Sequence, residues 1–208
     1  MIKVKICGIT NLEDAITATS AGADALGFIF TKKSPRYINL DEAEKIIRQL
    51  DPFTAKAGIF MDEEQGAVLE IASHLKLNVL QFHGKEGPAY CNFFRPKFKV
   101  IKVIFFDDAP LSKKIAAYKV DAFLFDIPYE DKQGGRKTLS ADKLKDISAL
   151  IKSGYRVIIS GGLNPKNVLT VKKFNPYAVD VASGVEKMVG KKDEDLVKEF
   201  IQKVKELR

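Results

Sequence analysis

Short runs of β-branched and aromatic residues alternate along the chain with segments in which apolar residues recur every three or four positions. The runs have the length of buried strands and predict strands at residues 3–7, 24–30, 55–60, 78–82, 99–106, 121–126, 156–160 and 178–182. The intervening segments have the spacing of amphipathic helices. Their apolar stripes include Ala43, Ile46, Ile47 and Leu50, then Val68, Ile71, Ala72 and Leu75, and finally Val197, Phe200, Ile201 and Val204.

Several predicted helices also carry end signals. The segment from Thr10 to Glu13 has the Thr-x-x-Glu sequence of a capping box. Asn164 followed by Pro165 has the order of an N-cap and a first helical residue. Gly22, ahead of the second strand, is expected to end the first helix.

Eight strand–helix units in this order predict an α/β fold with eight parallel strands. Most units repeat about every 22 residues, close to the lower size limit of a closed barrel. We therefore predict a single (β/α)8 TIM barrel that forms one domain over residues 1–208, with an open doubly wound sheet as the alternative. Such a barrel has its active site at the carboxyl ends of the strands. The two longest units add residues at 31–39 and 127–139, where a substrate could be held.

Composition and charge narrow the possible functions. The 208 residues include 34 Lys and Arg against 27 Asp and Glu, a net charge of +7, and only two Cys, which excludes a disulfide framework. The charges are interspersed, which favours a solvated surface over a nucleic-acid patch and also suits a phosphorylated substrate. No apolar run approaches the ~18 residues of a membrane helix, and the start lacks a signal-peptide pattern. We expect a cytoplasmic protein with no membrane or nucleic-acid partner; a non-catalytic basic binding protein is the alternative class.

Two residues at strand ends could carry acid–base chemistry. Alternation along the first strand turns Lys5 and Cys7 toward the barrel interior. The charge of Lys5 could lower the pKa of the Cys7 thiol and make it a base, although a small buried cysteine would look the same. Asp126 closes an apolar strand and could be a general acid, or a helix cap or salt-bridge partner. Cys91 and His74 lie in helical segments and are expected to be a structural cysteine and a surface histidine.

Other candidates follow the remaining strands. Gly161 and Gly162 follow the seventh strand and Ser183 and Gly184 the eighth, where barrels bind phosphate through backbone N–H groups; two ordinary tight turns are the alternative. Gln81, His83 and Asp180 could contact substrate or satisfy a neighbour, and Lys5 is also expected to contact substrate. Arg36, in the long second loop, could grip a carboxylate, or be a surface arginine. No residues have metal-ligand spacing, so no metal is expected.

Together these residues resemble one family, the phosphoribosylanthranilate isomerases, which are (β/α)8 barrels of tryptophan biosynthesis. The resemblance covers the whole chain in order. It is carried by the segments Lys3-Val4-Lys5-Ile6-Cys7-Gly8-Ile9-Thr10, Gly27-Phe28-Ile29-Phe30, Ser34-Pro35-Arg36-Tyr37, Gln81-Phe82-His83-Gly84, Leu124-Phe125-Asp126, Ser160-Gly161-Gly162-Leu163 and Asp180-Val181-Ala182-Ser183-Gly184-Val185-Glu186.

The resemblance implies an Amadori rearrangement of N-(5′-phosphoribosyl)anthranilate to 1-(2-carboxyphenylamino)-1-deoxyribulose 5-phosphate. It gives Asp126 the role of acid and Cys7 that of base, while Arg36 holds the anthranilate and the glycine loops hold phosphate. No cofactor is implied, and a monomer or a homodimer is expected. The segment 133–140 departs from the family's glycine-rich pattern and lacks its tryptophan. The competing enzyme is another sugar-phosphate isomerase or epimerase on the same barrel, but metal-dependent epimerases need His and carboxylate ligands that these strand ends do not supply.

Overall fold

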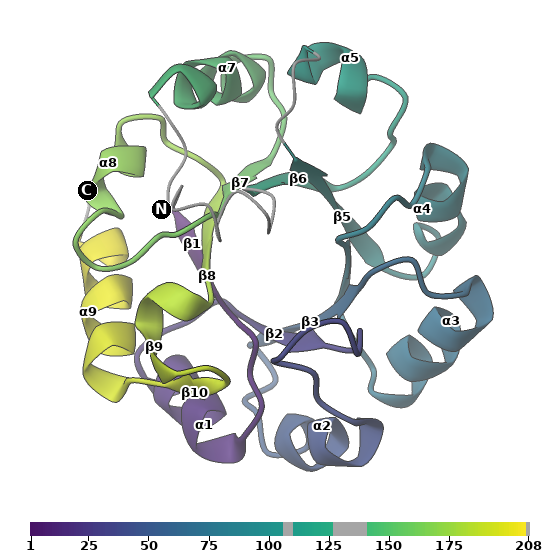
Figure 1. The fold of residues 1–208 in the computed structure, drawn as a ribbon, viewed down its shortest axis with the longest axis vertical. Coiled ribbons are helices and arrows are strands. Elements are labelled where there is room, and N and C mark those ends of the chain that lie inside the picture. Colours follow the sequence, from purple (N-terminus) through teal and green to yellow (C-terminus); the bar gives the residue numbers. More distant parts are fainter. Residues whose placement is uncertain (106–109, 127–140, 207–208) are drawn as a thin grey trace.

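A computed structural model describes residues 1–105, 110–126 and 141–206 of the chain. Eight parallel strands pair in sequence order and close into a barrel, so the predicted fold class is confirmed (Figure 1). The strands are β1 (Lys3–Cys7), β2 (Ala25–Ile29), β3 (Ala55–Phe60), β4 (Val79–Phe82), β5 (Lys99–Phe105), β6 (Ala122–Asp126), β7 (Val157–Ile159) and β8 (Ala178–Val181). Each described strand end lies within one residue of its predicted position.

The helices form a ring outside the barrel (Figure 1). They are α1 (Leu12–Ser20), α2 (Leu40–Ile47), α3 (Gln65–His74), α4 (Pro88–Phe94), α5 (Leu111–Ile115), α7 (Ala141–Lys152), α8 (Leu169–Lys172) and α9 (Glu194–Lys205). After β8 the chain forms a short 3-10 helix, η1 (Ser183–Val185), and a two-stranded hairpin of β9 (Glu186–Met188) and β10 (Lys191–Lys192). The sequence analysis did not predict this hairpin.

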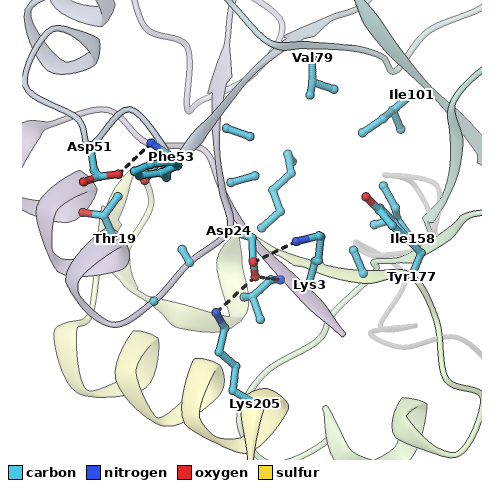
Figure 2. A pocket seen from close by; sticks show the side chains of 18 of the residues that line it. Lys3, Thr19, Asp24, Asp51, Phe53, Val79, Ile101, Ile158, Tyr177 and Lys205 are labelled. Atoms are coloured by element: carbon cyan, nitrogen blue, oxygen red, sulfur yellow. Dashed lines mark hydrogen bonds and ion pairs between the residues drawn. The ribbon is translucent and has the colours of Figure 1, made fainter. Parts of the chain in front are cut away.

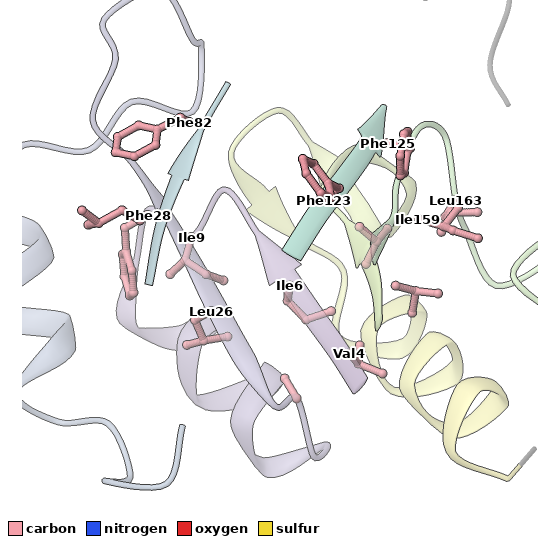
Figure 3. Packing of buried hydrophobic residues seen from close by; sticks show 14 of the residues in the cluster. Val4, Ile6, Ile9, Leu26, Phe28, Phe82, Phe123, Phe125, Ile159 and Leu163 are labelled. Carbon is pink, nitrogen blue, oxygen red and sulfur yellow. The ribbon is translucent and has the colours of Figure 1, made fainter. Parts of the chain in front are cut away.

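The main hydrophobic core lies between the barrel and the helices. Side chains such as Val4, Ile6 and Phe28 leave the outer faces of their strands and pack with Phe123 and Phe125 in one buried cluster (Figure 3). The four stripe residues of α9 are buried in the same cluster, as predicted: Val197, Phe200, Ile201 and Val204. Alternate residues of the strands fill the barrel interior instead, and there they form a second cluster of Ile101, Val103, Ala122, Leu124, Ile158 and Ala178.

The structure confirms the predicted end of the first helix but not its predicted start. Asn11, not Thr10, is the N-cap of α1, because its side-chain oxygen accepts the N–H of Asp14 at 2.9 Å. The Thr10 hydroxyl donates instead to the carbonyl of Gly190 in the β9–β10 hairpin. Gly22 ends the helix as expected, with a φ of 98° that a residue with a side chain rarely adopts.

Polar side chains cap the amino ends of three strands. Asp24 accepts the N–H of Val4 at 2.9 Å, Asn78 that of Lys56, and Asp121 that of Val100. Each acceptor lies just before the next strand, so it satisfies a backbone donor that the barrel ladder leaves unpaired. These caps stabilise the amino-terminal end of the barrel.

That end also opens into a cavity of about 730 Å³ (Figure 2). Its walls include the apolar side chains Val79, Ile101 and Ile158, and its rim carries Lys3 and Lys205, which both contact Asp24. The cavity lies at the opposite end of the barrel from the predicted acid and base. Across the part of the chain that the structure describes, no helix is long and apolar enough to cross a membrane.

Candidate active site

A smaller cavity of about 170 Å³ lies at the carboxyl ends of the strands. Ten of the eleven predicted site residues line it: Cys7, Arg36, Gln81, His83, Asp126, Gly161, Gly162, Asp180, Ser183 and Gly184. The eleventh, Lys5, lies two residues before Cys7 on β1. The structure therefore brings together side chains from both halves of the chain, as the barrel prediction requires.

Strand alternation explains why Cys7 and Asp126 face this cavity. On β1 the outward residues Val4 and Ile6 pack in the helix-facing core, which leaves Cys7 on the inner face. On β6 Phe125 packs outward, so Asp126 turns inward. Gly27 on β2 makes room for the thiol, because a Cβ at that position would lie 2.8 Å from the Cys7 sulfur.

A buried ion pair lies beneath the thiol. Lys5 Nζ donates to Asp180 Oδ1 at 2.6 Å, and the Ser160 hydroxyl donates to the other oxygen of Asp180 at 3.3 Å. Burial raises the pKa of the Cys7 thiol and outweighs the lowering effect of Lys5, while Asp180 raises it further. The expected thiolate character is therefore wrong, because the sulfur is desolvated by burial and the charge of Asp180 opposes that of Lys5.

Asp126 lies beside a histidine. His83 Nε2 is 3.7 Å from Asp126 Oδ2, and the Gln81 amide nitrogen is 3.3 Å from His83 Nδ1. The ring of Phe105 packs against the imidazole with a centroid distance of 5.4 Å. Among the residues that the structure describes, buried Gln81 Oε1 has no hydrogen-bond partner, so this amide presents an unsatisfied acceptor at the cavity wall.

Arg36 reaches the same cavity from the loop after β2, but it is held by another residue of the chain. Its Nε and Nη2 each lie 2.7 Å from an oxygen of Glu186, a bidentate pair. Lys192 Nζ contacts the same carboxylate at 3.0 Å. Burial alone would raise the pKa of Glu186, but Arg36 and Lys192 hold it below its ordinary value.

The two glycine loops meet at the cavity. Gly161 and Gly162 have φ angles of 90° and 68°, in the left-handed region that favours glycine. Gly184 lies so close to the other loop that a Cβ there would be 1.8 Å from the Leu163 carbonyl oxygen. Both loops therefore line the cavity, and their backbones approach each other closely at Gly184.

Three polar residues of this region have roles that the sequence did not predict. Ser160 and Glu186 lie in the segments that carry the family resemblance, but nothing local indicates that they bind Asp180 and Arg36. Lys192 precedes the N-cap of α9 and looks like a surface lysine, yet it is 2% exposed. The predictions for two residues in helical segments are confirmed. Cys91 is buried in α4, and His74 is on the surface beside Glu44.

The expected substrate-gripping loop at 127–139 and the unusual segment 133–140 lie outside the described residues. Within the described ranges, no group of three or more His, Cys, Asp and Glu side chains is arranged to hold a metal ion.

Fold and cavity together are those of a (β/α)8-barrel enzyme whose candidate site lies at the carboxyl ends of the strands. The sequence profile of the N-(5'phosphoribosyl)anthranilate (PRA) isomerases matches residues 4–203. The chain belongs to this isomerase family, which serves tryptophan biosynthesis.

Individual relatives agree over the full length. The N-(5'-phosphoribosyl)anthranilate isomerase of Pelobacter propionicus is 42% identical over 100% of this chain and 98% of its own. The crystal structure of the Thermotoga maritima isomerase is 37% identical and matches with a TM-score of 0.90 over 99% of this chain and 100% of that one. Another isomerase structure, 38% identical with a TM-score of 0.84 over the same shares, holds reduced 1-(o-carboxyphenylamino)-1-deoxyribulose 5-phosphate.

Proposed function

We propose that this chain converts N-(5′-phosphoribosyl)anthranilate to 1-(2-carboxyphenylamino)-1-deoxyribulose 5-phosphate by general acid–base catalysis. The observation that carries the proposal is the cavity in which Cys7 and Asp126 face a common space beside two glycine loops. An aldose–ketose rearrangement needs a proton donor for the ring oxygen and a base for the C2 proton, and this pair can supply both.

In the first step the carboxylic acid of Asp126 gives its proton to the furanose oxygen as the C1–O bond breaks, which leaves a protonated Schiff base. Cys7 then takes the C2 proton through its thiolate, which is the minor form at neutral pH because burial raises the pKa of the thiol, and the electron pair moves to the nitrogen to form an enolamine. Tautomerisation to the ketone moves a proton from O2 to C1. The enzyme is left as Asp126 carboxylate and Cys7 thiol, so one proton must pass from Cys7 to Asp126, through solvent, before the next turnover.

The remaining site residues hold the substrate. Arg36 binds the anthranilate carboxylate, and the buried acceptor of Gln81 takes a hydrogen bond from a ribose hydroxyl. His83 and Asp180 contact further polar groups of the sugar, and Lys5 acts on Cys7 through its charge. The backbone N–H groups of Gly161, Gly162, Ser183 and Gly184 bind the phosphate.

The substrate's own nitrogen is the electron sink, so the reaction uses no cofactor and no metal. We propose that the chain works as a single domain over residues 1–208 in the cytoplasm, as a monomer or a homodimer. Its partner is a phosphorylated small molecule rather than a nucleic acid or a membrane.

The test is turnover of N-(5′-phosphoribosyl)anthranilate, followed by loss of its anthranilate-type fluorescence. We expect turnover to continue unchanged after a metal chelator is added. Absence of turnover would refute the activity, and activity that a chelator abolishes and one divalent ion restores would refute the mechanism.

A further inference from the structure

We propose that Glu186 and Lys192 are positioning residues for the reaction: Glu186 fixes the guanidinium of Arg36 for the substrate carboxylate, and Lys192 keeps that assembly positive next to Cys7. The inference rests on the proposed function, because it assigns Arg36 and Cys7 their roles there. Neither residue was singled out by the sequence.

The geometry of the Arg36–Glu186 pair is that of a fixed support. Both hydrogen bonds are 2.7 Å long and use the Nε–Nη2 edge of the guanidinium, so the plane of the group is set. Side-chain exposure is 19% for Arg36 and 4% for Glu186, which places the carboxylate behind the guanidinium and away from solvent. Gly8 packs against this arginine, since a Cβ at position 8 would lie 2.6 Å from Arg36 Cδ.

Lys192 completes the support from the other side. Its Nζ donates to Glu186 Oε1 at 3.0 Å and to the Ala182 carbonyl at 3.2 Å, and its side chain is 1% exposed. Its backbone N–H donates to Asp14 on α1 at 2.7 Å. A lysine so deeply buried is costly unless it is paired, so its contact with Glu186 is a built feature of the site.

The charges explain why two cations surround one carboxylate. Arg36 and Lys192 contribute two positive charges and Glu186 one negative charge, so the cluster has a net charge of +1. Without Lys192, Glu186 would cancel the charge of Arg36 and leave little attraction for an anionic substrate. With Lys192, the arginine is oriented and the site remains positive.

The β9–β10 hairpin that supplies Glu186 and Lys192 is anchored to the start of α1. Thr10 donates to the carbonyl of Gly190 at the hairpin turn, and the buried backbone N–H of Lys192 donates to Asp14 on α1. Figure 1 shows the hairpin beside α1. The hairpin therefore has a defined position from which its two charged side chains enter the site.

Lys192 also affects the base. The charged groups nearest Cys7 are Lys5 on β1, Asp180 on β8 and Lys192 on β10. Lys5 is the cation with the larger lowering effect on the thiol pKa, Asp180 opposes it, and Lys192 adds a smaller effect in the same direction as Lys5. Across the same cavity, Asp126 and His83 face the thiol from β6 and from the end of β4.

Glu186→Gln gives the sharper test, because orientation and net charge predict opposite results. The variant keeps the shape of the side chain and adds one positive charge to the cluster, which would tighten binding if only charge mattered. If Glu186 orients Arg36, KM should rise about tenfold, the effect of losing one charge-assisted contact, while kcat changes less than about threefold. Glu13→Gln, an exposed change of the same charge, is the matched control and should leave both constants unchanged. An unchanged or lower KM in Glu186→Gln would overturn the proposal.

Lys192→Met tests the second half, with Lys191→Met on the same strand as its control. We expect Lys192→Met to raise KM and to move the pH midpoint for alkylation of Cys7 by iodoacetamide to higher pH, while Lys191→Met changes neither. Lys192→Arg keeps the positive charge, so its KM should lie between that of Lys192→Met and that of the wild type. The same alkylation midpoint in Lys192→Met and wild type would overturn the link to Cys7. If Lys192→Met does not fold, Lys192→Arg is compared with Lys191→Arg instead. A rise in KM is then expected in Lys192→Arg alone.

Binding of reduced 1-(o-carboxyphenylamino)-1-deoxyribulose 5-phosphate, measured by calorimetry, separates this inference from the proposed function. A wild-type protein that neither turns over the substrate nor binds this probe refutes the proposed function. A wild-type protein that does both, with equal probe affinity in Glu186→Gln, refutes only the positioning role. The expected result is wild-type binding with about tenfold weaker affinity in the variant.

Discussion

Cys7 and Asp126 end strands β1 and β6 and line the same cavity, but their neighbours differ. Cys7 lies near the Lys5–Asp180 pair and Lys192, whereas Asp126 lies beside His83. Two groups in different surroundings can hold different protonation states, which an acid–base pair requires. Each proton-transfer group is typically worth about 10²–10⁴ in rate.

Cys7→Ala and Asp126→Asn should therefore each lower kcat by about 10²–10⁴ and leave a folded protein. Cys7→Ser should be nearly as poor as Cys7→Ala, because a hydroxyl is far less acidic than a thiol. Steady-state kinetics give the rates, and circular dichroism melts confirm that each variant is folded. Normal kcat in either Cys7→Ala or Asp126→Asn would remove that residue from the mechanism.

The pH dependence of Cys7 can be measured without turnover. Because burial raises the pKa of this thiol above the ordinary 9.0, its thiolate fraction should fall about tenfold for each pH unit below that point. The alkylation rate of Cys7 in the free protein should rise with pH to a midpoint above 9.0, as measured by mass spectrometry of the Cys7 peptide. A midpoint below 8 would contradict the raised pKa.

Arg36 is expected to act in binding. A carboxylate held far from C2 is held equally in the ground state and the transition state, so its loss weakens binding without changing the chemical step. Arg36→Ala should raise KM by a larger factor than it lowers kcat, in the same fluorescence assay. A collapsed kcat at an unchanged KM would place Arg36 in the chemistry instead.

At the scale of elements, the phosphate site depends on how closely the loops after β7 and β8 approach each other. Gly184→Ala would place a methyl group 1.8 Å from the Leu163 carbonyl oxygen, so the loops must separate. We expect a loss of about 1–3 kcal/mol in the free energy of unfolding and a higher KM for the phosphorylated substrate. Urea denaturation and kinetics measure both effects.

Gly66→Ala in α3 is the control, because a Cβ there meets nothing within 4 Å. It should leave KM unchanged and stabilise the helix slightly.

A crystal soaked in phosphate should also hold the ion at Gly162, Ser183 and Gly184. An ion bound only elsewhere would contradict this site.

The sequence predicted the strands and the inward-facing side chains because both follow from local rules. Two-residue alternation is enough to turn Cys7 inward once Val4 and Ile6 are assigned to the core. The order of the units then places all strand ends on one face. For this reason the site could be predicted without knowing which residues contact each other, and ten of the eleven predicted residues line one cavity.

Properties that depend on distant partners could not be predicted in the same way. Glu186 lies 150 residues from Arg36, and no local pattern pairs them. The pKa of Cys7 was predicted in the wrong direction because the sequence shows Lys5 nearby, but not how fully the fold buries the thiol or that Asp180, on another strand, opposes Lys5. The predicted N-cap was wrong by one residue, because the Thr10 hydroxyl donates to the carbonyl of Gly190, which is far away in the sequence.

At the scale of the whole molecule, both ends of the barrel affect how stability depends on pH. Asp121, a strand cap at the amino-terminal end, and Glu186 at the site both have pKa values below their ordinary ones. In each case burial opposes the shift, and hydrogen bonds and nearby cations outweigh it. A lowered pKa means that the stabilisation is present above the unfolded pKa and is lost as pH falls through the folded one. Stability should therefore decline below about pH 4.

At alkaline pH the change of stability with pH has the opposite sign. Burial raises the pKa of Cys91 to about 11 and also raises that of Cys7, so the folded protein holds these protons after the unfolded chain has released them. A raised pKa gives stability that is complete below the unfolded value, about 8.5, and is lost as pH rises toward the folded value. The free energy of unfolding should therefore be greatest between these limits and fall on both sides.

Urea denaturation at intervals from pH 3 to pH 10 measures this profile. Asp121→Asn should reduce the slope on the acid side, because one carboxylate with a lowered pKa is removed. Cys91→Ala should lower stability at all pH values by leaving a small cavity, but it should also make the decline between about pH 8.5 and 10 shallower. The slope is the relevant quantity, since the cavity does not depend on pH. An unchanged alkaline slope in Cys91→Ala would show that the Cys91 thiol does not contribute to it.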